Sequence, residues 1–430
     1  MKNLDLTVKL GGLTLRNPIV IGGSPLAGTA RHIMDCVDAG VGAVVTKTAN
    51  PVVHLQRYPR PLYKLVDYRK NPQDPYAVPE SYTWMHREHN SVYPPEAFAK
   101  IIAQASGYAR ERGVPIIGNF TARGVEEWVR IAELYASSGA DALELNFCCP
   151  FPPEGVARSE EDTRIGIFYT MNPDRAAEVV RAIKRVVGVP VFVKVSPDGS
   201  AFVRVARAMQ EAGANGITMF ANNKLLRIDV EEGKPILYGP TAATHPGMMA
   251  DSLRWVAEVA RAVDLPIMGG RGANTWRDVV EFLMAGATAV QLVQAVMLRG
   301  LGHVREVLDG LQRFMERRQY AGVAEIQGKA LKHIYSNLDL IDKVKPLYAA
   351  FNLRQCTGCR RCVEACWYDA IKFYRKAVPV QENCAGCSLC SQVCPAGVIT
   401  MRERENDLEH FRAMASAHRD LAPADITWDA

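Results

Sequence analysis

The sequence predicts an α/β protein: a closed barrel of eight parallel strands and eight helices, followed by a small cysteine-rich domain. Short apolar runs alternate with amphipathic stretches along the first two thirds of the chain. Each run is too short for a helix and is apolar on both faces, as a strand buried in a parallel sheet must be. Eight such units with right-handed crossovers close into a (β/α)8, or TIM, barrel. A doubly wound open sheet is the alternative, but no Gly-x-Gly-x-x-Gly follows the first run.

The candidate strands and helices follow one another in regular order. The eight strands are Pro18 to Gly22, Ala43 to Thr46, Pro115 to Asn119, Ala142 to Asn146, Val191 to Val195, Gly216 to Met219, Ile267 to Gly269 and Ala289 to Val293. The helical patterns include Val125 to Ser138, Arg175 to Val187, Ala201 to Ala212, Asp251 to Val263 and Trp276 to Ala285. Most of these patterns are followed by Gly-Ala or Gly-Val, which is typical of a helix C-cap.

Three insertions interrupt this order, and each follows a strand. They span Ala49 to Pro95, Phe147 to Met171 and Phe220 to Met249. The carboxyl ends of the strands are where barrel enzymes carry their active sites, so we expect the insertions to cover the site. The second insertion combines prolines with a charged stretch, which predicts a lid, with a merely solvated loop as the alternative.

Eight of the eleven cysteines form two runs near the C-terminus. The runs are Cys356-x2-Cys359-x2-Cys362-x3-Cys366 and Cys384-x2-Cys387-x2-Cys390-x3-Cys394-Pro395. This spacing is typical of a ferredoxin-like domain with two [4Fe-4S] clusters, in which the fourth cysteine of each run binds the other cluster. One cluster would take Cys356, Cys359, Cys362 and Cys394, and the other Cys384, Cys387, Cys390 and Cys366. A disulfide framework and zinc sites both fit the spacing poorly.

Composition excludes several classes of protein. The net charge is +5 over 430 residues and the basic residues are scattered, which predicts neither a nucleic-acid nor a membrane partner. The N-terminus lacks the apolar core of a signal peptide, and no apolar run has the length of a membrane span. We therefore expect a cytoplasmic protein, in keeping with unpaired cysteines.

Polar groups at the strand ends indicate a flavin. Lys47 and Lys194 end the second and fifth strands, where two converging cations suit a reduced flavin. Gly269-Gly270 and the helix start at Asn274 to Trp276 offer backbone N–H groups for a phosphate, with a simple glycine turn as the alternative. Because clusters transfer single electrons whereas carbon substrates take a hydride, FMN would convert between the two.

These features give the domain organisation. We expect an FMN-binding barrel at 1–318, a helical connector at 319–345, the two-cluster domain at 346–405 and a C-terminal tail at 406–430.

Several motifs resemble the FMN barrel of class 1 dihydroorotate dehydrogenases. They are Thr46-Lys47-Thr48, Ala142 to Asn146 leading into Cys148-Cys149-Pro150, Phe192-Val193-Lys194, and Gly269-Gly270. With the cysteine module, nearly the whole chain resembles the FMN- and iron–sulfur-containing subunits of bacterial NAD-dependent dihydropyrimidine dehydrogenases. This resemblance implies FMN contacts from Gly23, Lys47, Thr48, Asn119, Asn146, Lys194, Thr218, Gly247, Gly269, Gly270, Gln294 and Ala295.

The resemblance also implies a reaction. Cys149 matches the general acid or base of the family, and Asn146 and Asn90 match asparagines that bind substrate. The Asn-Thr pair that the family carries after the sixth strand is replaced here, so Asn222 or Asn223 would take its place. Hydride from FMN and a proton from Cys149 would reduce, or in reverse form, a polarised C=C bond, foremost that of uracil or thymine.

The electrons would come through the clusters from an FAD-containing partner subunit that oxidises NAD(P)H, and we expect a homodimer within a hetero-oligomer. Two alternatives stay open. The same machinery would act on a different cyclic unsaturated substrate, or the chain would be an electron-transfer subunit whose barrel has lost catalysis. The presence of Cys149 argues against the second.

Overall fold

The computed structural model describes residues 4–52, 61–69, 81–88, 90–149, 164–199, 201–336, 339–340 and 343–404. Contacts within the chain divide it into two units, Met1–Lys332 and His333–Ala430. The division falls inside the segment expected to connect the barrel to the cysteine-rich domain. No helix in the described ranges is long and apolar enough to cross a membrane.

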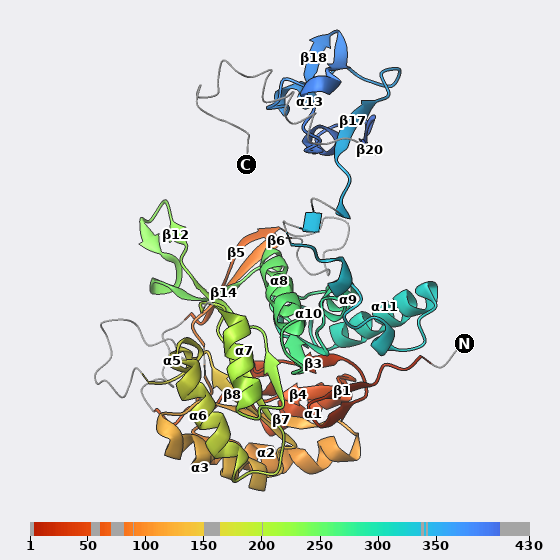
Figure 1. Cartoon of the computed structure of the whole chain (residues 1–430). Coiled ribbons are helices and arrows are strands. Elements are labelled where there is room, and N and C mark those ends of the chain that lie inside the picture. The colour runs from red at the N-terminus through yellow and green to blue at the C-terminus, as the bar shows by residue number, and fades with distance from the viewer. Residues whose placement is uncertain are drawn as a thin grey trace. The chain divides into compact units, whose positions relative to one another are not determined.

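The first unit is a closed eight-stranded barrel, as the sequence predicts (Figure 1). All eight predicted strands form, and each pairs in parallel with its neighbours. The last strand pairs with the first and closes the barrel. In chain order the strands are β3 (Ile19–Ile21), β4 (Ala43–Val45), β7 (Ile116–Phe120), β8 (Ala142–Phe147), β9 (Val191–Val195), β10 (Gly216–Thr218), β15 (Ile267–Gly269) and β16 (Ala289–Leu292).

A long helix follows each barrel strand and packs on the outside of the barrel (Figure 1). These helices are α1 (Ala30–Asp38), α2 (Pro95–Glu111), α3 (Gly124–Ser137), α6 (Pro173–Lys184), α7 (Phe202–Glu211), α8 (Met249–Ala260), α9 (Trp276–Met284) and α11 (Gly302–Arg318). Their apolar faces and the strands form one continuous core.

Shorter elements complete the first unit. An N-terminal hairpin joins the same core through the buried side chains of Leu10 and Leu15. The hairpin is β1 (Val8–Leu10) and β2 (Leu13–Leu15), and the short helices are η1 (Pro25–Ala27), α5 (Ile167–Met171), η3 (Ile236–Tyr238), η4 (Pro246–Met248), α10 (Gln294–Arg299) and η5 (Val323–Glu325). The turn η6 (Leu331–His333) contains the point of division between the two units. Residues 150–163, most of the predicted lid, lie outside the described residues.

The first and third insertions combine into one additional sheet of four strands. The first insertion supplies β5 (Tyr63–Arg69) and β6 (Ser81–His86), and the third supplies β11 (Asn223–Leu225) and β14 (Thr241–Thr244). Their order is β11-β14-β6-β5, and β14 pairs antiparallel with β6, so that Ala242 lies opposite His86. We call these four strands the roof sheet. The third insertion also holds a small ribbon, β12 (Ile228–Asp229) and β13 (Lys234–Pro235).

The second unit carries the cysteine runs on two small hairpin-like pairs. β17 (Leu347–Phe351) pairs with β20 (Ile399–Glu403), and β18 (Ile371–Tyr374) pairs with β19 (Lys376–Pro379). Each run enters a one-turn helix, α13 (Arg361–Glu364) or α14 (Leu389–Gln392). Gly358 and Gly386 occupy equivalent left-handed positions, with φ of +71° and +70°, between the first two cysteines of each run. The two cysteine runs thus share the same local backbone conformation at this position.

Candidate active site and cluster cavities

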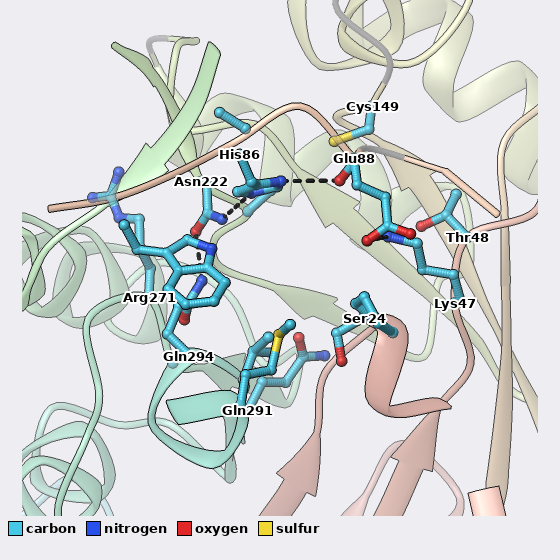
Figure 2. Close-up of a pocket in the computed structure, with 18 of the residues that line it drawn as sticks. Ser24, Lys47, Thr48, His86, Glu88, Cys149, Asn222, Arg271, Gln291 and Gln294 are labelled. Carbon is cyan, nitrogen blue, oxygen red and sulfur yellow. Dashed lines mark hydrogen bonds and ion pairs between the residues drawn. The ribbon is translucent and has the colours of Figure 1, made fainter. Parts of the chain in front are cut away.

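A cavity opens at the carboxyl ends of the barrel strands, beneath the roof sheet (Figure 2). Its empty volume, open mouth included, is about 810 Å³, within the range of small-molecule sites. Barrel residues and roof residues both contribute side chains to the wall. The polar or catalytic candidates among them are Ser24, Lys47, Thr48, Tyr63, Trp84, His86, Glu88, Asn146, Cys149, Lys194, Asn222, Arg271, Gln291 and Gln294.

Strand register explains why distant polar residues meet in this cavity. Asn146 on β8 lies directly opposite Lys194 on β9, and Lys194 lies opposite Thr218 on β10. The Asn146 amide donates to Thr48 Oγ1 at 2.9 Å, which links β8 to the residues that follow β4. Because these neighbouring parallel strands are paired in this register, Asn146, Lys194 and Thr218 lie at the same level of the barrel.

Glu144 lies fully buried in the barrel interior and joins side chains from four other strands. Its carboxylate accepts hydrogen bonds from Asn119 at 2.5 Å, Thr218 at 2.6 Å and Gln291 at 3.1 Å. Lys194 Nζ lies 3.9 Å from the same carboxylate and 3.5 Å from Gln291 Oε1. A buried carboxylate needs such partners, because its desolvation would otherwise be prohibitive. This network sets the position of Lys194.

Lys47 forms the second buried cation of the site. Its ammonium lies 3.8 Å from the carboxylate of Glu88, which also accepts a hydrogen bond from the hydroxyl of Tyr63 on the roof sheet. Burial lowers the pKa of Lys47, while the charges of Glu88 and Cys149 act in the opposite direction. The ion pair thus joins the residues that follow β4 to the segment that follows β6.

The two adjacent cysteines after β8 differ in environment. The side chain of Cys148 is fully buried, and this burial raises the pKa of its thiol well above the ordinary value. Cys149 is half-buried and lines the cavity. Its backbone N–H donates to Asn146 Oδ1 at 3.0 Å, and Cys148 donates to the same oxygen at 3.1 Å. The Asn146 side chain therefore organises the turn that presents the Cys149 sulfur to the cavity.

The two candidate asparagines after β10 take separate roles. Asn222 lines the cavity and hydrogen-bonds His86 at 2.8 Å and Gln294 at 3.3 Å (Figure 2). Asn223 begins β11 and accepts a hydrogen bond from the buried guanidinium of Arg271. Arg271 is also paired with Asp251. Only Asn222 of this pair is placed to meet a ligand.

Other predicted residues do not line the cavity. Asn119 and Thr218 bind Glu144 beneath it, Asn90 and Ala295 are buried, and Gly247 lies in the exposed turn η4. Gly269 faces α9, because a Cβ there would come within 2.5 Å of the Phe282 ring. These contacts give Asn119, Thr218 and Gly269 structural roles in addition to any contact with FMN.

The start of α9 differs from the phosphate site that the sequence predicts. The carboxylate of Asp278 accepts hydrogen bonds from the backbone N–H groups of Asn274 and Thr275, at 2.7 and 2.8 Å. A carboxylate that already occupies these donors disfavours a second anion. Gly270 and Gln294, two of the predicted FMN contacts, line the cavity and could contact a phosphate there.

The cavity fits a flat polar cofactor such as FMN. Ser24 Oγ lies in its wall, and both this oxygen and the buried Asn119 Oδ1 lack a hydrogen-bond partner among the described residues. Gly23 and Gly270 line the wall where the backbone packs closely, because a Cβ there would come within 3.0 Å of Thr46 O and 2.2 Å of Gln291 O. Residues that would hold FMN are thus Gly23, Ser24, Lys47, Lys194, Gly270 and Gln294.

The second unit brings the cluster cysteines together in two cavities. One is lined by Cys356, Cys359, Cys362 and Cys394, and the other by Cys366, Cys384, Cys387 and Cys390. These are the two sets that the crossed ligation pattern of a two-cluster ferredoxin requires. In the described parts of the chain, no three cysteine, histidine or acidic side chains converge closely enough for a single metal ion. Four thiols around a cavity fit a cluster better than a zinc ion.

Comparison with known proteins agrees with both units. The sequence profile of the dihydroorotate dehydrogenase family matches residues 93–315, just over half of the chain. The chain belongs to the dihydroorotate dehydrogenase family. A second profile, the 4Fe-4S dicluster domain, matches residues 349–401. The protein is therefore a flavin and iron–sulfur oxidoreductase of the dihydroorotate dehydrogenase family.

Individual members of this family support the assignment. The chain is 30% identical over 329 residues to the dihydroorotate dehydrogenase B (NAD(+)) catalytic subunit of Pyrococcus abyssi, covering 76% of this chain and 99% of that protein. It is 33% identical to the subunit of the same name from Anoxybacillus flavithermus, covering 67% of this chain and 84% of that protein. About a quarter of the present chain lies outside the match to the Pyrococcus protein.

Several polar residues of the site were not predicted from the sequence. Glu144 and Gln291 carried a usable signal, because each is a polar residue within a buried and mostly apolar strand. His86, Glu88 and Tyr63 carried none, because their position depends on the pairing of two insertions that are far apart in the sequence.

Proposed function

We propose that this protein reduces, or reversibly forms, the polarised C=C bond of a neutral pyrimidine such as uracil or thymine. Cys149 is the proton donor on one side of the cavity, and Asn146 and Asn222 bind the carbonyl and N–H groups of the ring. When bound, FMN supplies hydride transfer and the two clusters supply single-electron transfer. The donor is an FAD-containing, NAD(P)H-oxidising partner subunit, in line with the NAD(+) in the names of the relatives.

The charge balance of the cavity is the observation that carries this proposal. Three cations line the described part of the wall, and each has a carboxylate partner. Lys47 pairs with Glu88 at 3.8 Å, Lys194 lies 3.9 Å from Glu144, and Arg271 pairs with Asp251. Dihydroorotate carries a carboxylate of its own, and the cavity offers it no uncompensated cation among these groups. Uracil and thymine carry no such charge, so the balance favours them.

Cys149 is placed for proton transfer by its neighbours. The turn that holds its backbone N–H on Asn146 also directs its sulfur toward the cavity, on the side of Lys47 and Glu88 (Figure 2). A cysteine thiol titrates close enough to neutral pH to give up a proton to a developing carbanion. We also propose a cytoplasmic location, which suits oxygen-labile clusters.

Substrate comparison tests the proposal. The chain is purified anaerobically with its electron-delivering partner, and NADH oxidation is measured with uracil, thymine, orotate and an unsaturated lactam. We expect turnover with uracil and thymine and little with orotate. Turnover with orotate alone would refute the proposal. Turnover with the lactam alone would favour another cyclic substrate. No reoxidation of the photoreduced flavin by any of them would favour an electron-transfer subunit.

A further inference from the structure

A row of three polar side chains crosses the cavity beneath the roof sheet. His86 ends β6, Asn222 follows β10, and Gln294 begins α10. His86 Nε2 lies 2.8 Å from Asn222 Nδ2, and Asn222 Oδ1 lies 3.3 Å from Gln294 Nε2 (Figure 2). All three side chains line the cavity, so the row faces any ligand there.

The protonation of His86 is determined by its other ring nitrogen. Nδ1 lies 2.9 Å from the backbone carbonyl oxygen of Glu88. A carbonyl only accepts hydrogen bonds, so Nδ1 must carry a proton. In the neutral imidazole Nε2 is then an acceptor, and it must receive an N–H from Asn222. The Asn222 oxygen correspondingly accepts from Gln294.

We infer that His86 is a positioning residue that fixes which end of the Asn222 amide is donor and which is acceptor, and so sets the specificity of the cavity for a cyclic amide. With these two bonds made, Asn222 still has one N–H and one oxygen lone pair for a ligand. A donor beside an acceptor matches the C=O and N–H of a cyclic amide. The inference relies on the proposed function only for the identity of that ligand.

A second proton on His86 would reverse this arrangement. Nε2 would become a donor, and only the oxygen of Asn222 could then face it. The amide would rotate, and its donor and acceptor would exchange places in the cavity wall. Ligand binding should therefore weaken when His86 gains this proton. For an ordinary imidazole, with a pKa of about 6.5, this happens at acidic pH.

The groups around His86 come from several elements. On β5, the ring of Tyr63 stacks on the imidazole at 6.1 Å between centroids. Arg87 and Glu88 follow it in the chain, and Lys47 pairs with Glu88. On β14, the strand partner is Ala242, and Thr241 donates to the His86 carbonyl. Arg271 lines the same cavity.

Two substitutions separate positioning from packing. In His86→Gln, a side-chain oxygen takes the place of Nε2 as a non-titrating acceptor. In His86→Phe, the ring remains against Tyr63 but both nitrogens are lost. His32→Gln, at an exposed position of α1, is the matched control for the loss of a histidine.

The first measurement needs no substrate. The full chain, labelled with 15N-histidine, is examined at pH 8 by long-range 1H–15N NMR, and His86 is assigned as the signal missing from His86→Gln. We expect the tautomer protonated at Nδ1. A signal protonated at Nε2 would overturn the inference.

The second measurement titrates uracil into the flavin-loaded chain and follows the flavin absorbance. We expect His86→Phe to weaken binding on the order of ten-fold or more, because a buried amide donor loses its acceptor. His86→Gln should bind within about three-fold of the unmodified protein and lose the weakening at acidic pH. In turnover the loss should fall on KM more than on kcat.

The outcomes separate the two hypotheses. Unchanged binding in His86→Phe, or an acidic weakening that persists in His86→Gln, would refute the positioning role. If the unmodified protein shows the Nδ1 tautomer but does not bind uracil, the proposed substrate is wrong while the positioning of Asn222 stands.

Discussion

At the scale of single residues, Cys149 is the side chain on which the proposed chemistry depends. It is half-buried at the cavity wall, whereas the adjacent Cys148 is fully buried. The sequence alone placed both cysteines after the fourth barrel strand, and the turn that the Asn146 side chain holds explains why Cys149 reaches the cavity.

Replacing Cys149 by Ala should lower kcat by about 10²- to 10⁴-fold, the usual contribution of a positioned acid or base. Flavin and iron content should not change, since neither the cluster cysteines nor the residues expected to hold FMN are altered. Steady-state kinetics and absorbance spectra check this. Cys148→Ala is the matched control, and a larger loss in that variant would move the catalytic role to Cys148.

The thiols should also differ in reactivity. Burial raises the pKa of Cys36 to about 12 and that of Cys148 well above its ordinary value, so both thiols stay protonated at pH 8. Because the thiolate is the nucleophile, iodoacetamide at pH 8 should modify Cys149 and spare these two. Peptide mass spectrometry of the native protein measures this. Labelling of Cys36 should increase only toward strongly alkaline pH, and equal labelling of all three at pH 8 would contradict the assigned burial.

At the scale of elements, Glu144 connects β8 to four other strands beneath the cavity. Its hydrogen bonds to Asn119, Thr218 and Gln291 are buried, and Lys194 lies beside them. Such a network contributes to the barrel as a whole and not to one strand pair.

Glu144→Gln should therefore lower the free energy of unfolding by about 3 kcal/mol, because it leaves the buried Lys194 without its carboxylate. Urea unfolding followed by tryptophan fluorescence gives the value. The exposed Glu133 on α3 supplies the control: Glu133→Gln should change stability by no more than about 0.5 kcal/mol. Equal effects of the two substitutions would show that the network adds nothing to stability.

The sequence predicts the regular elements and misses the pairing of the irregular ones. All eight barrel strands lie within two residues of their predicted bounds, because buried parallel strands have a clear apolar signature. The roof sheet has no such signature, since β6 and β14 come from insertions separated by four barrel strands. The polar residues at the ends of the barrel strands could be predicted because the strands themselves were recognised. His86, Glu88 and Tyr63 could not, because their positions depend on the roof sheet.

At the scale of the whole molecule, the chain consists of two units with separate tasks. The barrel unit holds the cavity, and the C-terminal unit holds the two sets of cysteines. The loss of one cluster should therefore leave the flavin site intact.

Cys362→Ala tests this division. It removes one thiol of the first cavity and should lower the iron content from about eight to about four atoms per chain. Bound flavin should be unchanged, while NADH-dependent turnover through the partner is lost. Iron analysis and flavin absorbance measure both quantities, with Cys36→Ala as the control. Unchanged iron in Cys362→Ala would refute the assignment of this cysteine as a ligand.

The pairing of β6 with β14 has a consequence for how new specificities arise. Because Ala242 lies opposite His86 across this pair, a substitution in one insertion alters the backbone on which the other depends. Selection for a new substrate, in nature or in the laboratory, should accordingly fix changes in both segments jointly. In a homologue that exchanges one insertion alone, β6 and β14 would pair poorly, although the barrel residues of the cavity would be unchanged.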